Sequence, residues 1–283
     1  MKIVEWDDLL GKKDGFKGPV RLTIGVFDGV HLGHRRLLRE ITGSGARQNA
    51  VGTTPAGHTP VVVTFRNRLP ASKGGLPGQL QTFRQKVRCL EALGVGGIVA
   101  IDFSEQLSRL SGKTFIRVLR ENLTIEKIAV GYDFRFGRDR DTDSQSLRNL
   151  MGADTEVSVV DPLFHGGEAV SSSRIRTAIR DGRLELAAEM LAAPYSLDIS
   201  DIKAEKSLLE KRAIKARKSD IRQCLPKPGC YPVSCEAETA AFDGLLIVRE
   251  DEIELELSGG GKIQEVVFTT GTTQSERSPT QCL

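Results

Sequence analysis

Residues 21–34 read RLTIGVFDGVHLGH, and this stretch decides the fold. The first seven residues are rich in β-branched and apolar side chains and predict a short strand over 21–27. Glycine and histidine follow, and then Leu37, Leu38 and Ile41 recur at helical spacing. A strand that passes through a glycine-containing turn into a helix is the first unit of a parallel α/β sheet. The turn is therefore expected at the carboxyl edge of that sheet, where ligands bind.

The same alternation continues along the first two thirds of the chain. Residues 61–65 (VVVTF) form a continuous apolar run of the kind that is buried in a parallel sheet. Residues 42–60 are rich in Gly, Thr and Pro and predict a mobile loop. Strands spaced by helices predict a doubly wound parallel-sheet (Rossmann-like) α/β domain. Further strands are expected at 98–103, 125–131 and 155–160, and further helices at 80–93, 114–123, 173–181 and 184–191.

The pattern changes near Pro194, which divides the chain into a domain of residues 1–195 and a small β-rich domain of residues 196–283. Eight Lys and Arg stand among three acidic residues in residues 203–222, and we interpret this run as a solvated helical face. In residues 253–257 apolar residues alternate with Glu. A Gly259–Gly261 turn then leads to residues 263–268, which predicts a β-hairpin.

Charge and composition limit the function classes. The 283 residues carry a net charge of +3, with +6 in residues 1–195 and −3 in residues 196–283. This balance argues against a basic face for duplex nucleic acid, whereas a moderate positive field suits a small phosphorylated ligand. No apolar run approaches the ~18 residues that span a bilayer, and the start MKIVEWDDLLGKKDG is unlike a signal peptide. The five cysteines follow no zinc-like spacing, so we expect no metal site of the protein's own. Together these features predict a cytoplasmic protein with no membrane or nucleic-acid partner.

The turn at residues 25–34 has the composition of a phosphate site. Its glycines allow backbone N–H groups to approach a phosphate, and the helix N-terminus adds partial positive charge. His31 and His34 can both project into the turn and donate hydrogen bonds as charge develops in a transition state. The alternative is that both imidazoles only cap or pack the turn.

Four motifs in order carry a family resemblance. The string GVFDGVHLGH at 25–34 resembles the nucleotidyltransferase superfamily, and within it the bacterial bifunctional riboflavin kinase/FAD synthetases. VGYDFRFG at 130–137 is similar to that family's VGxDFRFG, and VSSSRIR at 170–176 to its ISSTxIR, with Ser173 for Thr. GRLELAAEMLAAPYSL at 182–197 is similar to the helix and PYS that close the family's adenylyltransferase domain.

The resemblance implies an FMN adenylyltransferase, which transfers AMP from ATP to FMN and releases pyrophosphate, with Mg²⁺ held through the ATP phosphates. It implies that His31 and His34 are catalytic and that flavoenzymes receive the FAD. The implied ATP site comprises Gly25, Phe27, Asp28, Gly33, Ser171, Ser172, Ser173 and Arg176. The implied flavin site comprises Asp133, Phe134, Phe136, Gly137 and Arg140. From the residues alone, Ser171–Ser173 can equally be an ordinary helix N-cap, and the two Phe can be buried core side chains.

The resemblance breaks in two places. After the strand at 61–65 the family usually continues with Asp/Glu-Pro-His-Pro, whereas RNRLP (66–70) follows here. The kinase segment GxxxGRxLGFPTAN has no counterpart in residues 198–224, although LPKPGCYPV at 225–233 is similar to the family's LPKPGVYAV. We therefore expect a truncated, degenerate kinase domain without riboflavin kinase activity. The alternatives are a fully bifunctional enzyme, a transferase for another phosphate acceptor, and a flavin- or nucleotide-binding homologue without catalysis.

Overall fold

The structure is a computed structural model that describes residues 1–11, 15–43, 57–66, 78–102, 104–202, 205–206, 213–238, 240–259 and 262–269. It contains two compact units. Unit 1 comprises Met1–Pro70 with Lys86–Ala169, and unit 2 comprises Ala71–Gln85 with Val170–Leu283. The boundary expected at residue 195 lies inside unit 2, and the extent of the adenylyltransferase domain stays a prediction.

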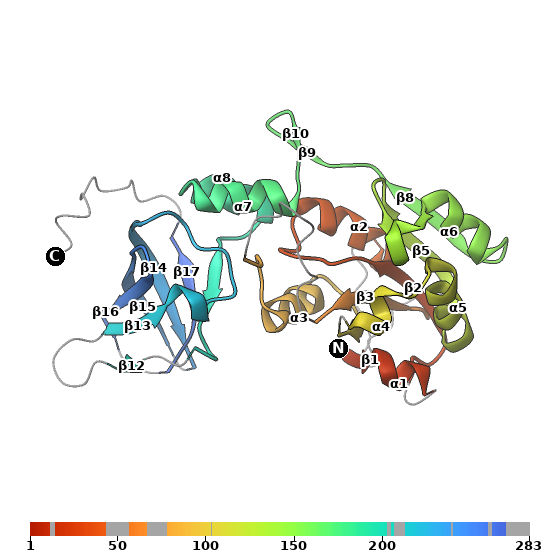
Figure 1. The fold of residues 1–283 in the computed structure, drawn as a ribbon, viewed down its shortest axis with the longest axis horizontal. Helices are drawn as coiled ribbons and strands as arrows, with labels where there is room; N and C mark the ends of the chain where they lie inside the picture. Colours follow the sequence, from red (N-terminus) through yellow and green to blue (C-terminus); the bar gives the residue numbers. More distant parts are fainter. Residues whose placement is uncertain are drawn as a thin grey trace. The chain divides into compact units, whose positions relative to one another are not determined.

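Unit 1 is built on a six-stranded sheet of order β1-β4-β3-β2-β5-β8, in which every pairing is parallel (Figure 1). The chain steps from β2 to β3 to β4 and then continues in β5 on the other side of β2. The direction of winding therefore reverses between β2 and β5, and the expected doubly wound α/β fold is confirmed. The strands are β1 Lys2–Glu5, β2 Pro19–Ile24, β3 Thr59–Phe65, β4 Gly97–Ile101, β5 Thr124–Gly131 and β8 Glu156–Val160.

Helices cover both faces of this sheet (Figure 1). They are α1 Trp6–Leu10, α2 Leu32–Thr42, α3 Phe83–Ala92, which enters unit 1 at Lys86, α4 Glu105–Ser108, α5 Gly112–Asn122 and α6 Ser144–Met151. Two short antiparallel ladders and a 3-10 turn complete the unit: β6 Arg135–Phe136 with β7 Thr142–Asp143, β9 Phe164–His165 with β10 Glu168–Ala169, and Arg138–Arg140.

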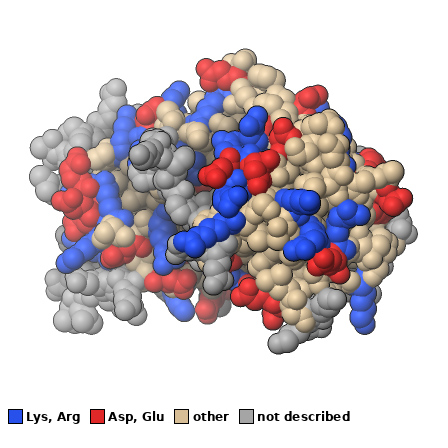
Figure 2. Space-filling model, turned by 45° about the vertical axis from the view of Figure 1, so that its right-hand side comes forward, with Lys and Arg blue, Asp and Glu red and all other residues tan. Residues whose placement is uncertain are grey.

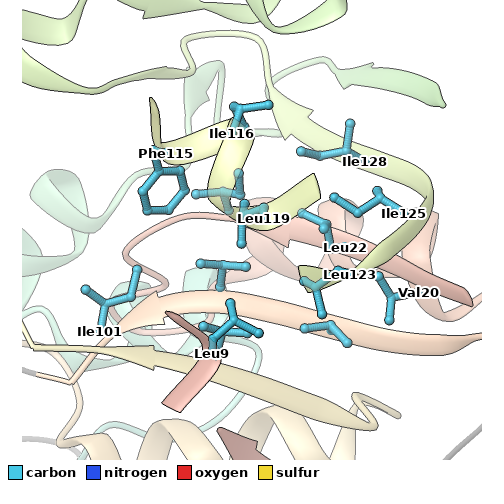
Figure 3. Packing of buried hydrophobic residues seen from close by; sticks show 14 of the residues in the cluster. Leu9, Val20, Leu22, Ile101, Phe115, Ile116, Leu119, Leu123, Ile125 and Ile128 are labelled. Atoms are coloured by element: carbon cyan, nitrogen blue, oxygen red, sulfur yellow. The ribbon is translucent and has the colours of Figure 1, made fainter. Parts of the chain in front are cut away.

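One apolar cluster fills the sheet face under α1, α5 and α6. Strand residues two apart point to the same face, so Val20, Leu22 and Ile24 of β2 all reach this cluster. Figure 3 shows side chains of α5, including Leu119, close to Leu22 and Ile128 of the central strands. The apolar faces of β2 and α5 thus pack in one core. This core holds in place the strands whose carboxyl ends carry the candidate site.

Several element boundaries in unit 1 differ from the sequence-based ones, and two of these differences bear on the turn after β2 and the loop before β3. The strand expected over 21–27 ends at Ile24, because Phe27 already has a left-handed backbone with φ of 51°. In the expected loop 42–60, Thr42 belongs to α2 and Thr59–Pro60 to β3, whereas residues 44–56 lie outside the described residues.

The described residues of unit 2 form the helices α7 and α8 and a seven-stranded sheet of order β11-β17-β14-β15-β16-β13-β12, whose pairings are all antiparallel. The expected β-rich C-terminal region is therefore confirmed. The elements are α7 Ser172–Arg180, α8 Leu184–Leu191, β11 Ser196–Asp198, β12 Glu205–Lys206, β13 Ala213–Arg217, β14 Gly229–Ala237, β15 Ala241–Val248, β16 Glu252–Leu257 and β17 Ile263–Phe268, with a 3-10 turn at Lys218–Asp220.

The predicted hairpin between residues 253–257 and 263–268 is wrong. Both segments are strands, but β16 pairs with β15 and β13, and β17 pairs with β14 and β11. Aromatic packing explains the choice of partners. Buried Phe268 stacks on Tyr195 with ring centroids 5.7 Å apart and meets Tyr231 edge-on at 5.8 Å. These contacts hold β17 beside β11 and β14. They join residues far apart in the chain, so the spacing of residues within a strand does not predict them.

The predicted helix over residues 203–222 is wrong in the described residues, because Glu205–Lys206 and Ala213–Arg217 form β12 and β13 and Lys218–Asp220 forms only a 3-10 turn. Strand β13 pairs with β16, whose sequence EIELEL is acidic. The register places Lys215 opposite Glu254, with 3.4 Å between Lys215 Nζ and Glu254 Oε2. Opposite charges on neighbouring strands stabilise a pairing, so part of the basic run faces an acidic strand.

Among the described residues, no helix has the length and apolar composition needed to cross a membrane. On the face drawn in Figure 2, acidic and basic side chains lie interspersed.

Replacing Leu119 by Ala tests the packing of the core in unit 1. Leu119 is completely buried, and the truncation leaves a cavity between α5 and the sheet. We expect a loss of about 2–5 kcal/mol in the free energy of unfolding, measured by urea denaturation. Leu10→Ala in α1 is the matched control, because Leu10 is 48% exposed. Equal effects of the two substitutions would contradict the packing described.

Candidate active site

The candidate active site lies on the turn between β2 and α2. Parallel strands β2 and β5 are neighbours, with Thr23 in register with Ala129. Residues 25–31 follow β2, and residues 132–137 follow β5, so both segments leave the sheet at its carboxyl edge where the winding reverses. In doubly wound folds this switch point is the place where ligands bind.

The backbone of the turn is strained. Phe27 and Val30 have φ of 51° and 37°, a left-handed conformation that costs a non-glycine residue on the order of 1–3 kcal/mol. The Phe27 ring is buried and fills the space beside Gly25, where an added Cβ would lie 3.0 Å from the ring. A side chain at position 25 would therefore press on this ring, which gives Gly25 a role in packing besides the expected one in binding a phosphate.

His31 and His34 form one stacked pair at the N-terminus of α2. Their ring centroids are 3.7 Å apart with the planes inclined by 17°. His31 is the N-cap, since its Nδ1 accepts a hydrogen bond from the His34 backbone N–H at 3.3 Å. Because Nδ1 of His31 accepts, the proton of the neutral ring is on Nε2. The capping alternative is thus realised for His31, and capping leaves its Nε2–H available as a donor.

The surroundings of the pair keep both imidazoles neutral. Burial lowers the pKa of His31 to about 4. Burial, and then the neighbouring His31 and Lys86, hold the pKa of His34 well below its usual value. The Phe27 ring packs against His34 with centroids 5.0 Å apart. Among the described residues, the buried Nδ1 of His34 has no hydrogen-bond partner. An unmet buried polar atom is costly, and a ligand that bonds to it recovers that cost.

Sequence reasoning missed Lys86. Its ammonium is buried and donates to the Val26 and Phe65 carbonyl oxygens at 2.8 and 3.0 Å, and to Thr64 Oγ1 at 3.3 Å. Burial lowers the pKa of Lys86 to about 8, against the opposing effect of Asp28, which is also buried. One signal was present in the sequence: Lys86 stands four residues before the buried Leu90, on the inward face of α3.

The segment after β5 is anchored by aromatic packing. Phe134 and Phe136 pack against the apolar cluster, and Phe136 meets Phe115 edge-on at 5.6 Å. Gly137 has φ of 81° and lies too close to Gly112 for a side chain. Asp133 and Arg140 are exposed. Both rings are partly buried against the cluster, whereas the two exposed charged residues are accessible to a ligand.

The serine and arginine candidates belong to unit 2 and are described within it. Ser171 is the N-cap of α7, and its Oγ accepts from the Arg174 backbone N–H at 3.2 Å. Arg176 donates from Nε to the Gly78 carbonyl oxygen at 2.9 Å. The N-cap alternative is thus realised at Ser171, whereas Ser172 and Ser173 lie in the first turn of α7. The structure thus brings together Gly25, Phe27, Asp28, His31, Gly33 and His34 in unit 1, and Ser171, Ser172, Ser173 and Arg176 in unit 2.

The altered segment after β3 is described only at Arg66. This residue forms ion pairs with Glu5 at the end of β1 and with Asp102 just after β4, the latter at 3.8 Å. Arg66, which departs from the family pattern, therefore connects the ends of the neighbouring strands β1, β4 and β3. Asn67–Pro70 lie outside the described residues.

A doubly wound sheet with a paired-histidine turn at its switch point defines a nucleotide-binding type of α/β domain. The family model of FAD synthetase matches residues 15–174, more than half of the chain. The chain belongs to the FAD synthetase family, and the resemblance drawn from the four motifs is confirmed.

Relatives with assigned functions agree with this family. The bifunctional riboflavin kinase/FMN adenylyltransferase of Escherichia coli K12 is 32% identical over 181 residues, which are 62% of this chain and 55% of that protein. The chain thus matches about half the length of this relative. The protein of the same description from Listeria monocytogenes is 28% identical over 219 residues, covering 75% of this chain and 66% of that protein.

A solved structure shares the fold. It is described as a macrolide-efflux protein from Streptococcus pneumoniae, and it superposes with a TM-score of 0.74 at 21% identity, over 97% of this chain and 94% of that chain. At this identity the likeness shows the fold alone.

The lowered pKa of His31 predicts how stability depends on pH. Between about pH 6.5 and pH 4 the unfolded chain binds a proton at His31 that the folded chain does not, so the free energy of unfolding falls as the pH falls through this window. We expect this group to contribute up to roughly 3 kcal/mol of that loss. Urea denaturation at pH 7.5, 6 and 4.5 measures it. His31→Asn is the comparison, because Asn keeps an N-cap acceptor but does not titrate; equal pH slopes in both proteins would contradict the assignment.

Proposed function

We propose that this protein is an FMN adenylyltransferase, which converts FMN and ATP to FAD and pyrophosphate. The observation that carries the proposal is the stacked pair of neutral imidazoles, His31 and His34, at the N-terminus of α2 on the switch-point turn. Membership of the FAD synthetase family supports it, as do relatives described as FMN adenylyltransferases.

The reaction needs no protein nucleophile. An oxygen of the FMN phosphate attacks the α-phosphorus of ATP, and the bond from that phosphorus to the α,β-bridging oxygen breaks as pyrophosphate leaves with the electron pair. Negative charge grows on the bridging oxygen and spreads over the transferring group. His31, His34 and the first amides of α2 donate hydrogen bonds to these oxygens. Because the donors are fixed before substrate arrives, they interact most strongly with the charge distribution of the transition state.

Mg²⁺ enters this proposal as part of the MgATP substrate. The turn offers two imidazoles and one carboxylate, Asp28, beside a lysine. Mg²⁺ prefers a set of oxygen ligands, so this donor set does not fit a resident ion. We therefore assign the ion to the ATP phosphates, where it neutralises charge on the leaving pyrophosphate.

The remaining site assignments follow the family resemblance. Gly25, Phe27, Asp28 and Gly33 shape the nucleotide pocket, and Ser171–Ser173 with Arg176 hold the leaving phosphates. Residues 133–140 hold the flavin or adenosine. Support for the last assignment is the exposure of Asp133 and Arg140 on a segment whose Phe134 and Phe136 are fixed in the apolar cluster.

Loss of riboflavin kinase activity is part of the same proposal. It rests on the missing Mg-ATP segment in residues 198–224, part of which forms β13 and pairs with the acidic β16. We also propose a cytoplasmic location, with flavoenzymes as recipients of FAD. The scattered spacing of the five cysteines agrees with a reducing compartment.

One assay separates the alternatives. The purified full chain is incubated with MgATP and either FMN or riboflavin, and flavins and pyrophosphate are quantified by chromatography and a coupled assay. We expect FAD and pyrophosphate from FMN and no FMN from riboflavin. Conversion of riboflavin to FMN would show a bifunctional enzyme, and flavin binding without product would show a homologue that has lost catalysis. Activity with a different phosphate acceptor alone would reassign the substrate.

Substitution of either histidine tests the roles assigned to them. We expect His31→Ala and His34→Ala each to lower the rate of FAD formation by roughly 10²-fold or more, which is the effect of losing one donor to the transition state. The rate is measured at saturating FMN and ATP. His165→Ala, a change in β9 outside the motif at 25–34, is the matched control and is expected to keep the wild-type rate. Wild-type rates in both site variants would refute the assignment.

A further inference from the structure

The Val26 carbonyl oxygen receives two hydrogen bonds from buried side chains. Lys86 Nζ donates to it at 2.8 Å, and Thr64 Oγ1 donates at 3.0 Å. Lys86 also bonds to Thr64 Oγ1 and to the Phe65 carbonyl oxygen. One ammonium therefore joins the turn after β2 to the end of β3.

This contact comes directly before the strained part of the turn. Phe27 and Val30 are left-handed, and such a backbone persists only where its surroundings hold it. At the far side of the turn, Arg35 donates from Nε to the Val30 carbonyl oxygen at 3.2 Å. Side-chain hydrogen bonds thus hold the backbone at both ends of the strained stretch, from Lys86 and Thr64 at Val26 and from Arg35 at Val30.

The conformation of Phe27 sets the position of the histidines. Its ring is buried against His34, and His34 stacks on His31. If the Val26 carbonyl is released, the turn can relax toward an ordinary backbone, and the Phe27 ring then leaves its place under His34. Errors of about 1 Å in the position of a catalytic group can cost 10²-fold in rate.

The three protons of the Lys86 ammonium match its three acceptors in unit 1. Lys86 acts on the turn and not on a phosphate directly, because a phosphate contact would require it to give up one of these bonds. Only the protonated amine offers all three donors, so its hold on the turn is complete while the ammonium persists.

We propose that Lys86 is a positioning residue for the adenylyl transfer, which holds the Val26 carbonyl and through Phe27 sets the orientation of the His34–His31 pair. This inference rests on the proposed function. It adds a residue from α3 to a site that the motif at 25–34 confines to one turn and one helix.

The test compares Lys86→Met, Lys86→Arg and Thr64→Val with the wild-type protein. Lys113→Met in α5 is the matched control, because Lys113 is exposed and the change also removes one lysine charge. We expect Lys86→Met to lower kcat for FAD formation by roughly 10- to 100-fold with the KM for ATP changed by less than about threefold. Thr64→Val, which removes the second donor to Val26, is expected to lower kcat by about three- to tenfold.

The pH profile separates positioning from a purely structural role. Burial lowers the pKa of Lys86 to about 8, so kcat/KM of the wild-type protein is expected to fall as the pH rises through about 8, where the ammonium is lost. Lys86→Met lacks this limb, and Lys86→Arg moves it to higher pH. The imidazole NMR signals of His34 and His31 shift in Lys86→Met and stay in place in Lys113→Met.

Outcomes distinguish this inference from the function on which it rests. Absence of FAD formation by the wild-type protein overturns the proposed function, and the NMR comparison then decides the positioning role alone. A folded Lys86→Met with wild-type kcat, pH limb and imidazole signals overturns the inference while the function stands. If Lys86→Met does not fold, a wild-type kcat in Thr64→Val together with an unshifted pH limb in Lys86→Arg overturns it equally.

Discussion

The candidate site depends on how the backbone carbonyl of Val26 is held. Two buried donors, the Lys86 ammonium and the Thr64 hydroxyl, fix this oxygen where the chain leaves β2. The next residue, Phe27, takes a left-handed backbone that directs its ring into the interior and against His34. Each link in this series is a short-range contact between packed groups, so the position of the imidazoles follows from the sheet below them. The apolar cluster under β2 and β5 supplies the rigid base that makes the series possible.

Electrostatics follow from the same packing. Burial, and then the neighbouring His31 and the positive charge of the buried Lys86, lower the pKa of His34 and keep it neutral. The turn therefore offers a ligand the uncharged imidazoles of His31 and His34, and the Lys86 ammonium lies buried against the same turn. Neutral imidazoles gain more from a growing negative charge than groups that are already committed to ion pairs, and this differential interaction is the requirement of transition-state stabilisation. The net charge of +6 in residues 1–195 acts in the same direction over a longer range.

Unit 2 is organised by different interactions. Its sheet is antiparallel, and partner choice among its strands reflects charge and aromatic packing. The basic β13 lies against the acidic β16, and β17 is held by Phe268 against two tyrosines. Similarity to the Listeria relative covers more of the chain than similarity to the Escherichia coli relative does. The landmark LPKPGCYPV leads into β14, at the centre of this sheet. The described C-terminal residues thus form a packed antiparallel sheet.

The amino-acid sequence by itself determined the alternation of strands and helices, the doubly wound sheet and the turn that carries His31 and His34. These features are local: periods of 2 and 3.6 and the residue types of a βα turn can be read within about ten positions. The four motifs also determined the family. Only the tertiary structure decided which strands of unit 2 pair, because Glu254 and Phe268 find their partners far along the chain. It also decided that Lys86 is buried under the turn, 60 residues from Val26. The physical reason is that the burial of Lys86 and the pairing of these strands depend on contacts between residues far apart in the chain. The local sequence pattern gives little information about such contacts.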